Sequence, residues 1–287
     1  MHITARFFKT LFKIPFFRIR YFGFYKRLFK PRNLFRGQSA ICRFDNNLKI
    51  KADLEEWIQQ HIYFLGTWDE PGSKFLKNYL KYGNVFMDIG ANIGCYSLIA
   101  SKIVGLEGEV HAFEPVSKVF DKMLFNIQLN QLSNITTNRK AVYESSGLLE
   151  FFLSSNENAG MSGIFHHDTE SGEIEKVESI TIDEYVEKKN ITRIDLIKID
   201  IEGAELFALK GMKNTINQFK PVIIMEVSED VLQNIPVKKN EALDLMEDLN
   251  YVRKGIDVNG RLIDPSRAPS GYTNYVFCPL KEVLING

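Results

Sequence analysis

Carboxylate side chains gather where a predicted apolar strand meets a predicted helix. Asp200, Glu202 and Glu205 lie within six residues, directly after the strand expected at 195–199. Ligands of parallel α/β sheets bind at the carboxyl ends of the strands, so these side chains are placed to meet a substrate. A carboxylate there can act as the general base that takes a proton from a hydroxyl group. We expect this role for Asp200 or Glu202, and count Glu205 and His166 as further catalytic candidates.

Other roles for these residues stay open at this stage. Carboxylates at a helix N-terminus are stabilised by the helix dipole, so Asp200 and Glu205 could be capping residues. His166 and His167 lie in a polar, glycine- and serine-rich segment and are alternative bases. Clustered carboxylates could also hold Mg²⁺ or Ca²⁺, but only three acids are evident, and we expect no metal site.

A glycine-containing loop directly follows another short apolar strand and opens a helix. Its sequence is Asp88-Ile-Gly90-Ala-Asn92-Ile-Gly94. Glycine lets the backbone approach a ligand closely, and Asn92 tolerates a positive φ almost as glycine does. Glu114 follows at the tip of the next strand, where an acid can accept both hydrogen bonds of a ribose diol. The pattern therefore predicts a nucleoside cofactor, although a plain strand–turn–helix junction is the alternative.

The same loop argues against a dinucleotide. It lacks two of the three glycines of the GxGxxG fingerprint. A carboxylate at Asp88 would also repel a pyrophosphate nearby. S-adenosylmethionine, which carries a sulfonium, an amino group and a ribose but no phosphate, suits this acid better.

The elements around these residues alternate between strand and helix. Strands are expected at 85–89, 109–113, 135–141, 195–199 and 222–227, with helices at 93–104, 116–130, 182–189, 204–211 and 241–249. Repeated strand–helix units predict a mostly parallel, Rossmann-like α/β sheet with helices on both faces. Two late strands, near Tyr251 and at 275–277, predict an antiparallel edge hairpin and bring the sheet to seven strands.

Charge is divided unevenly along the 287 residues, although the net charge is zero. Residues 1–44 hold 11 Lys and Arg and no acid, which leaves 25 basic and 36 acidic residues in 45–287. The three cysteines form no CxxC pair, so a zinc ribbon or disulfide scaffold is not expected. This cysteine usage fits a reducing, cytoplasmic compartment.

The basic N-terminal arm is also rich in aromatic residues. No apolar run in it approaches the ~20 residues that span a bilayer, and no signal peptide is recognisable. Cations interleaved with aromatics predict that residues 1–36 contact an anionic membrane surface, peripherally and on the inner face. Packing on the body or an oligomer contact is the alternative. Nucleic acid is not expected, because the acidic body would repel its backbone.

Three blocks of this sequence resemble the FkbM-type methyltransferases, a class I, S-adenosylmethionine-dependent family associated with O-methylation of sugar and polyketide hydroxyls. The blocks are Asp88 to Gly94, Ala112-Phe-Glu-Pro115 and Ile197 to Glu205, within a resemblance that covers about residues 55–230. The resemblance implies that the cofactor is S-adenosylmethionine, bound by the following residues: Asp88, Gly90, Asn92 and Gly94 on the methionine side, Glu114 on the ribose, Pro115 behind it, Ala141 and Val142 along the adenine, and Asp200 beside the transferable methyl group. Asn126 and Asn130 are expected to support the structure.

These observations combine into one hypothesis. Residues 1–44 are the basic arm, 45–83 a helical cover, and 84–287 a methyltransferase domain. The predicted reaction is O-methylation of a hydroxyl on a saccharide, in a surface glycan, glycolipid or related natural product. The alternatives are a non-catalytic membrane-associated adaptor with a decayed cofactor fold and an NAD-dependent sugar-modifying enzyme. The oligomeric state does not follow from the sequence.

Other polar and aromatic residues carry weaker expectations. Glu226 could contact the acceptor or cap a helix, and His61 could face the cleft. His111 is expected to be a satisfied core residue. Trp57 and Trp68 could cover the cofactor or stack on a sugar, with core packing favoured for Trp57.

Overall fold

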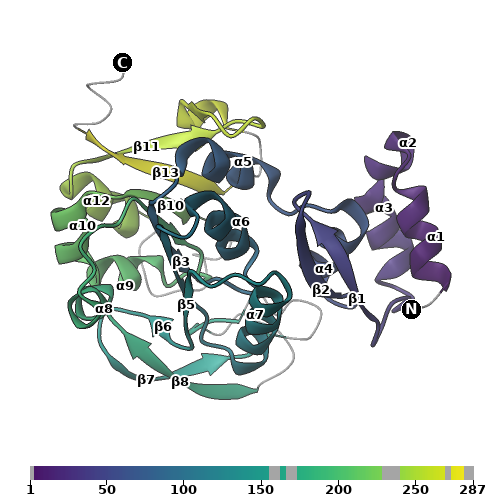
Figure 1. Cartoon of the computed structure of the whole chain (residues 1–287), viewed down its shortest axis with the longest axis horizontal. Helices are drawn as coiled ribbons and strands as arrows, with labels where there is room; N and C mark the ends of the chain where they lie inside the picture. The colour runs from purple at the N-terminus through teal and green to yellow at the C-terminus, as the bar shows by residue number, and fades with distance from the viewer. Residues whose placement is uncertain (1–2, 155–161, 166–172, 228–239, 269–272, 281–287) are drawn as a thin grey trace.

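An eight-stranded sheet forms the centre of the molecule, in the order β12-β11-β13-β10-β9-β3-β4-β5 (Figure 1). The computed structural model describes residues 3–154, 162–165, 173–227, 240–268 and 273–280. The sheet strands are β3 (Val85–Ile89), β4 (Glu109–Phe113), β5 (Ile135–Asn138), β9 (Leu196–Ile199), β10 (Val222–Glu226), β11 (Tyr251–Ile256), β12 (Leu262–Ile263) and β13 (Asn274–Pro279).

The strand directions confirm the predicted α/β fold. β5, β4, β3, β9 and β10 are parallel neighbours, and β13 runs antiparallel between β10 and β11. The order is that of the class I methyltransferase fold. The expected count of seven strands is wrong by one, because the two-residue strand β12 pairs with the outer edge of β11.

Helices cover both faces of this sheet because its strands are apolar on both sides. Phe86 faces a layer formed by α5 (Glu70–Tyr79), α6 (Cys95–Val104) and α7 (Ser117–Leu129). Met87, the next residue, faces a layer formed by α8 (Ile182–Lys189), α9 (Glu205–Lys210), α10 (Lys213–Phe219) and α12 (Glu241–Asp248).

The strand expected at 135–141 is divided between two sheets. β5 ends at Asn138, and β6 (Ala141–Val142) joins a separate three-stranded sheet in the order β6-β8-β7. The other members of that sheet are β7 (Gly147–Phe152) and β8 (Ile174–Ile180). A pair of cations, Arg139 and Lys140, separates β5 from β6.

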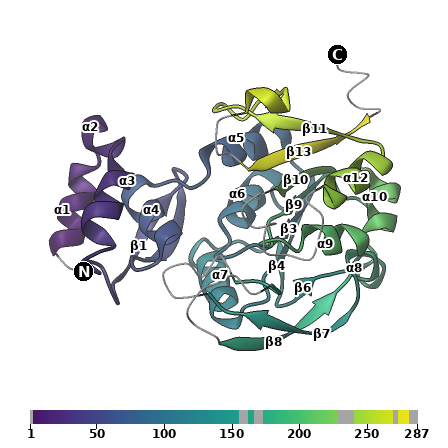
Figure 2. The ribbon, with the colours of Figure 1, turned by 180° about the vertical axis from the view of Figure 1, so that it is seen from behind.

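The basic arm is folded, and with the following segment it forms a unit beside the sheet domain (Figures 1 and 2). Its elements are α1 (Ile3–Leu11), α2 (Pro15–Arg18), α3 (Tyr21–Phe24), the π-helix η1 (Tyr25–Phe29), β1 (Ser39–Phe44), β2 (Leu48–Asp53) and α4 (Trp57–Leu65). β1 and β2 pair as a hairpin. The expected boundary after residue 44 therefore falls in the turn of this hairpin, which joins the arm to the segment 45–83.

Aromatic packing holds the arm against α4. Phe12, Tyr21, Phe29 and Phe35 are all buried, and the ring of Phe64 lies within 6.0 Å of each of them. The Tyr21 hydroxyl also donates to the side chain of Gln60, at 3.1 Å. The packing alternative for these inward-facing aromatics is therefore correct. No helix in the described part of the chain is long and apolar enough to cross a bilayer.

Amide side chains connect the hairpin to α7 and α4. The outward N–H groups of three alternate β2 residues each donate to an amide oxygen: Lys49 to Asn130 at 2.8 Å, Lys51 to Asn126 at 2.9 Å, and Asp53 to Gln59 at 2.9 Å. Asn126 also donates to the Ile93 carbonyl at 3.0 Å. Asn126 and Asn130 thus have the supporting role expected of them.

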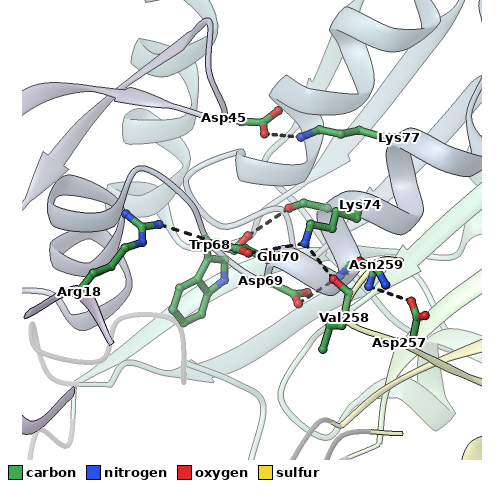
Figure 3. Close-up of polar contacts among 12 residues, drawn as sticks. Arg18, Asp45, Trp68, Asp69, Glu70, Lys74, Lys77, Asp257, Val258 and Asn259 are labelled. Atoms are coloured by element: carbon green, nitrogen blue, oxygen red, sulfur yellow. Dashed lines mark hydrogen bonds and ion pairs between the residues drawn. The ribbon is translucent and has the colours of Figure 1, made fainter. Parts of the chain in front are cut away.

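Helix α5 lies between the N-terminal unit and the sheet domain, and polar contacts join it to both (Figure 3). On one side Glu70 pairs with Arg18 at 3.9 Å, and Lys77 pairs with Asp45. On the other side Lys74 donates to the Val258 carbonyl at 2.9 Å. Asp69 is the N-cap of this helix, and its carboxylate accepts from the Gly72 N–H.

Candidate active site

A cavity of about 740 Å³ opens where the carboxyl ends of β3, β4, β9 and β10 meet. The glycine-containing loop after β3 and the tip of β4 form one part of its wall. Carboxylates at the ends of β9 and β10 form another, and aromatic residues of α4 and the α4–α5 connection form a third. Most of the residues predicted for the cofactor side and two predicted for the acceptor side therefore share one cavity: Asp88, Gly90, Asn92, Glu114 and Pro115, with Asp200 and Glu202.

The loop after β3 has the left-handed backbone that its residue types suggest. Gly90, Asn92 and Gly94 have φ of 79°, 51° and 90°. A Cβ at Gly90 would lie 1.9 Å from the Asp200 carbonyl oxygen, so only glycine lets the loop pass the end of β9. Gly94 is the N-cap of α6 and does not itself line the cavity, unlike Gly90 and Asn92.

Glu114 is buried at the tip of β4 and fixes this loop. Its Oε2 accepts from the Asn92 N–H and its Oε1 from the Val116 N–H, each at 3.0 Å. Burial raises the pKa of Glu114 to about 7, although these two hydrogen bonds oppose the shift. Each carboxylate oxygen keeps a second lone pair for a ligand hydroxyl. Pro115 follows in the cavity wall.

Asp88 is fully buried and has unused hydrogen-bonding capacity toward the cavity. Its Oδ2 accepts from the Ser97 hydroxyl at 2.5 Å, while Oδ1 has no hydrogen-bond partner among the described residues. Burial raises the pKa of Asp88, and the nearby Lys198 ammonium and the Ser97 hydroxyl oppose that shift. A buried carboxylate oxygen without a partner is unfavourable, so a cationic or N–H ligand group would be stabilised there.

Lys198 is a site residue that the sequence analysis did not identify. It lies within β9, opposite Asp88 on β3, with its side chain only 5% exposed. Its Nζ donates to Asp200 at 2.8 Å and lies 4.9 Å from the centroid of the Tyr96 ring. Despite burial, which lowers it, the carboxylates of Asp200 and Asp88 raise the pKa of Lys198. The sequence feature that could have identified Lys198 is a lysine inside an otherwise apolar strand.

Three carboxylates meet at the ends of β9 and β10. Oxygens of Asp200, Glu202 and Glu226 lie within 4.8 Å of one another. Burial would raise the pKa of Asp200, but the Lys198 ammonium and hydrogen bonds from Glu226 and Lys198 hold it below its usual value. Burial and the Asp200 charge raise the pKa of Glu202 to about 8, and also raise that of Glu226. The cluster therefore holds protonated and ionised carboxyls together, and its oxygens are also of the kind that bind a divalent cation.

Glu205 belongs to the turn rather than to the cavity. Its Oε1 accepts from the N–H groups of Ile201 and Gly203, at 3.1 and 3.2 Å, and it is absent from the cavity lining. The expectation of a catalytic role for Glu205 is therefore corrected to the capping alternative. Its carboxylate stabilises the strained turn in which Glu202 has φ of 53°.

The remaining predicted residues lie in different places. Ala141 and Val142 line a small cavity of about 20 Å³, which shares Gly90 and Pro115 with the large one. His166 and His167 lie outside the described residues. His111 is a satisfied core residue, with its ring nitrogens 2.9 Å from the Tyr185 hydroxyl and 3.1 Å from Glu109.

An aromatic wall faces the carboxylates. Trp57, His61 and Trp68 all line the cavity, and the His61 ring lies 5.9 Å from Trp57 and 5.4 Å from Trp68. Burial lowers the pKa of His61, which favours the neutral imidazole, and its Nδ1 lies 3.0 Å from the Thr67 carbonyl. Asp69, which the sequence analysis also missed, accepts from the Tyr96 hydroxyl at the same wall.

These features fit S-adenosylmethionine. The unpaired oxygen of Asp88 suits the amino group, and the buried acid Glu114 suits the ribose diol. Asp88, Glu114 and Asp200 make this wall acidic, which favours a cationic cofactor without phosphate. Together, the strand order and this wall define a class I methyltransferase fold.

Comparison with known proteins identifies the family. A model described as the methyltransferase FkbM domain matches residues 88–253. This is more than half of the chain, which belongs to the FkbM methyltransferase family, as the sequence motifs predicted. Members of this family depend on S-adenosylmethionine.

Individual relatives are distant. "Hexuronic acid methyltransferase AglP" of Haloferax volcanii is 29% identical over 141 residues, covering 49% of this chain and 55% of that protein. "Methyltransferase sdnD" of Sordaria araneosa is 28% identical over 154 residues, covering 44% of this chain and 59% of that protein. The matches thus span little more than half of each relative. The crystal structure of methyltransferase FkbM from Methylobacillus flagellatus has a TM-score of 0.44 and 19% identity, covering 68% of this chain and 43% of that one.

Proposed function

We propose that this protein transfers a methyl group from S-adenosylmethionine to a hydroxyl of a saccharide, in a surface glycan, a glycolipid or a related natural product. One observation carries the proposal: a single cavity joins the cofactor loop to a carboxylate cluster and an indole wall. Indole rings offer apolar faces for the C–H face of a sugar, and carboxylates accept hydrogen bonds from its hydroxyls. The name of the relative AglP supports a sugar acid or sugar as the substrate class.

The charges of the cluster favour a neutral sugar at the reacting position. Asp200, which stays ionised, would repel a uronate carboxylate placed against it, and Lys198, the only buried cation nearby within the described residues, already pairs with Asp200. A neutral hydroxyl instead donates a hydrogen bond to one carboxylate, and this hydrogen bond orients it. We therefore assign the methylated group as a hydroxyl.

The side chains act mainly by positioning and by taking up a proton. S-adenosylmethionine, when bound, supplies an electrophilic methyl group. Asp200, kept ionised by Lys198, accepts the acceptor O–H hydrogen bond and takes its proton as the new carbon–oxygen bond forms. Glu202, whose pKa is raised to about 8, is largely protonated near pH 7, so it can donate a hydrogen bond within the cluster rather than accept this proton. In-line placement of the hydroxyl supplies much of the rate.

Two measurements test this proposal. Calorimetry with S-adenosylhomocysteine and with NAD should show binding of the first and not the second; binding of neither would favour a non-catalytic adaptor. Methyl transfer from labelled S-adenosylmethionine to a panel of neutral hexosides and hexuronates should be confined to the neutral sugars. Transfer to hexuronates alone would contradict the assignment of a neutral sugar.

Variants then separate the roles of the acids. Asp200→Asn should lower kcat by about 10²-fold or more, as for loss of a general base, with S-adenosylhomocysteine affinity changed by a few-fold at most. Glu205→Gln is the matched control, since it alters a buried acid three residues from Glu202 that does not reach the cavity. It should lower stability more than kcat. Equal kcat losses in both variants would refute the assignment of the base.

A further inference from the structure

We propose that the outer face of α1, α2 and α3 docks on an anionic lipid bilayer and holds the mouth of the cavity beside the lipid headgroups. The docking itself stands on the observations below. Delivery of a lipid-carried acceptor to the cavity rests, in addition, on the proposed function.

The outer face carries large apolar side chains that the described residues leave at least half exposed. Six of them, all at least half exposed, fall within residues 3–22: Ile3 (87%), Phe7 (60%), Ile14 (50%), Phe16 (57%), Ile19 (77%) and Phe22 (51%). They are not a substitute for a missing core, because the inner face of the same helices already buries Phe12, Tyr21 and Phe29. The arm thus has two apolar faces, and only one is packed against the protein.

Cations lie directly on this apolar face. The Arg20 guanidinium sits 3.7 Å from the centroid of the Phe16 ring, and the Lys26 ammonium 4.3 Å from that of Phe22. With no acid among residues 1–44, the local charge is uncompensated within the arm. Exposed apolar side chains with cations around them match the interface of an anionic leaflet, where rings and aliphatic groups enter the headgroup layer and ammonium and guanidinium groups contact phosphates.

The same helices border the cavity. Phe22 of the exposed set lies 5.6 Å from Trp57, and the buried Tyr21 beside it lies 5.2 Å from His61; both Trp57 and His61 are cavity-lining residues. Arg18 of α2 reaches across to Glu70, between the cavity residues Asp69 and Pro71 (Figure 3). A bilayer that receives Phe22 therefore lies next to the aromatic wall.

Other occupants explain fewer of these observations. A nucleic acid would use the cations but gains nothing from exposed Ile3, Ile14 and Ile19. A second copy docked by the same face would place like charges against one another. Bilayer lipid satisfies both the apolar and the cationic groups.

The test is sedimentation of the full-length chain with vesicles. We expect binding to phosphatidylcholine vesicles containing phosphatidylglycerol, weak binding to phosphatidylcholine alone, and loss of binding at high salt. Ile19→Ser should weaken binding about tenfold, and Lys26→Gln with Arg27→Gln by a similar factor. Leu106→Ser is the matched control, because Leu106 is 82% exposed but lies in the α6–β4 connection, at the opposite end of the strands from the cavity.

The two tryptophans of the chain report the position of the cavity. Both line it, so vesicles with a spin-labelled phosphatidylcholine should quench their fluorescence on binding. Failure of the full-length chain to sediment with anionic vesicles, or equal weakening by Leu106→Ser, would overturn the docking. Two other outcomes would also overturn the docking. One is a dimer in light scattering that Ile19→Ser dissociates, and the other is tight binding of a duplex oligonucleotide in place of vesicles. Sedimentation without quenching would overturn the placement of the cavity.

S-adenosylhomocysteine calorimetry on the same samples keeps this inference separate from the proposed function. Unchanged affinity in Ile19→Ser shows that the variant is folded. Vesicle binding by a chain that binds no S-adenosylhomocysteine would support the docking while refuting the proposed function.

Discussion

Replacing Lys198 with methionine isolates the electrostatic role of the buried cation. Methionine keeps most of the apolar stem of the side chain. It removes the ammonium group that lies 2.8 Å from the Asp200 carboxylate and also acts on Asp88. Removing one partner of a buried ion pair costs about 3–5 kcal/mol. Because the Asp200 side chain keeps 33% exposure, we expect the lower end of that range, about 3 kcal/mol at pH 8.

Lys188→Met is the matched control. The Lys188–Glu184 pair has a similar N–O distance, 2.6 Å, but its side chains are 64% and 36% exposed. An exposed pair of this kind on a helix contributes only about 0.3–0.5 kcal/mol. Since the distances are nearly equal, the difference between the two variants measures the effect of burial.

The pH dependence gives the sharper test of Lys198→Met. In the wild type, the pKa of Asp200 is lower in the folded protein than in the unfolded chain. Asp200 therefore stabilises the fold at pH values above its unfolded pKa, and this stabilisation is lost only as the pH falls through its folded pKa. In the variant, burial without Lys198 raises that pKa instead. The destabilisation should therefore shrink as pH falls from 8 to 5, by at most about 1.4 kcal/mol per pH unit for each proton taken up.

Urea unfolding of both variants and the wild type at several pH values measures these differences. Adding Asp200→Asn to Lys198→Met should restore part of the lost free energy of unfolding, because the unpaired carboxylate is gone. A loss of unfolding free energy that does not depend on pH and is not rescued by Asp200→Asn would refute the electrostatic explanation. The loss would then be due to altered packing.

Three further predictions concern the loop after β3, the buried acid Glu114 and the hairpin. Gly90→Ala should abolish S-adenosylhomocysteine binding in calorimetry. Gly83 has nearly the same φ, 78°, but open space around it, so Gly83→Ala should lower the free energy of unfolding by only about 1–2 kcal/mol in thermal unfolding. Equal effects of the two variants on binding and on unfolding would contradict the role of the close approach at Gly90. S-adenosylhomocysteine affinity should rise with pH through about 7 as Glu114 ionises, and this rise should vanish in Glu114→Gln; a rise that persists would assign it to another group. Asn126→Ala should lower the free energy of unfolding by about 2–3 kcal/mol, more than Asn130→Ala, because Asn126 is fully buried; a larger loss for Asn130 would contradict this.

Local residue types made the backbone of the loop after β3 predictable. Gly90, Asn92 and Gly94 are residues that adopt a positive φ readily, and all three do so here. The alternation of apolar strands and helices likewise predicted the parallel sheet. Strand β12 was missed because two residues carry no periodic signal.

Tertiary contacts decided what the sequence left open. In the sequence, a carboxylate near a helix N-terminus looks the same whether it caps the turn, as Glu205 does, or lines the cavity, as Asp200 does. Lys198 was missed because a charged residue in a strand reveals its partners only once neighbouring strands are placed. The arm was ambiguous for a related reason, since its inward and outward aromatics are interleaved in sequence and separate only when α1 to α3 fold.

The amide oxygens that bind the outer edge of β2 have a consequence for the whole protein. Gln59, Asn126 and Asn130 contact alternate residues, so a shift of the strand by one residue would break all three hydrogen bonds together. They also leave these N–H groups unavailable to a strand from another molecule, which protects an otherwise open edge from aggregation. Because two of the amides come from α7, the N-terminal unit cannot slide along the sheet domain. If the outer face of α1 to α3 docks on a bilayer as proposed, the hairpin fixes the distance between that surface and the cavity residue Asp200, and with it the length of an acceptor that can reach it.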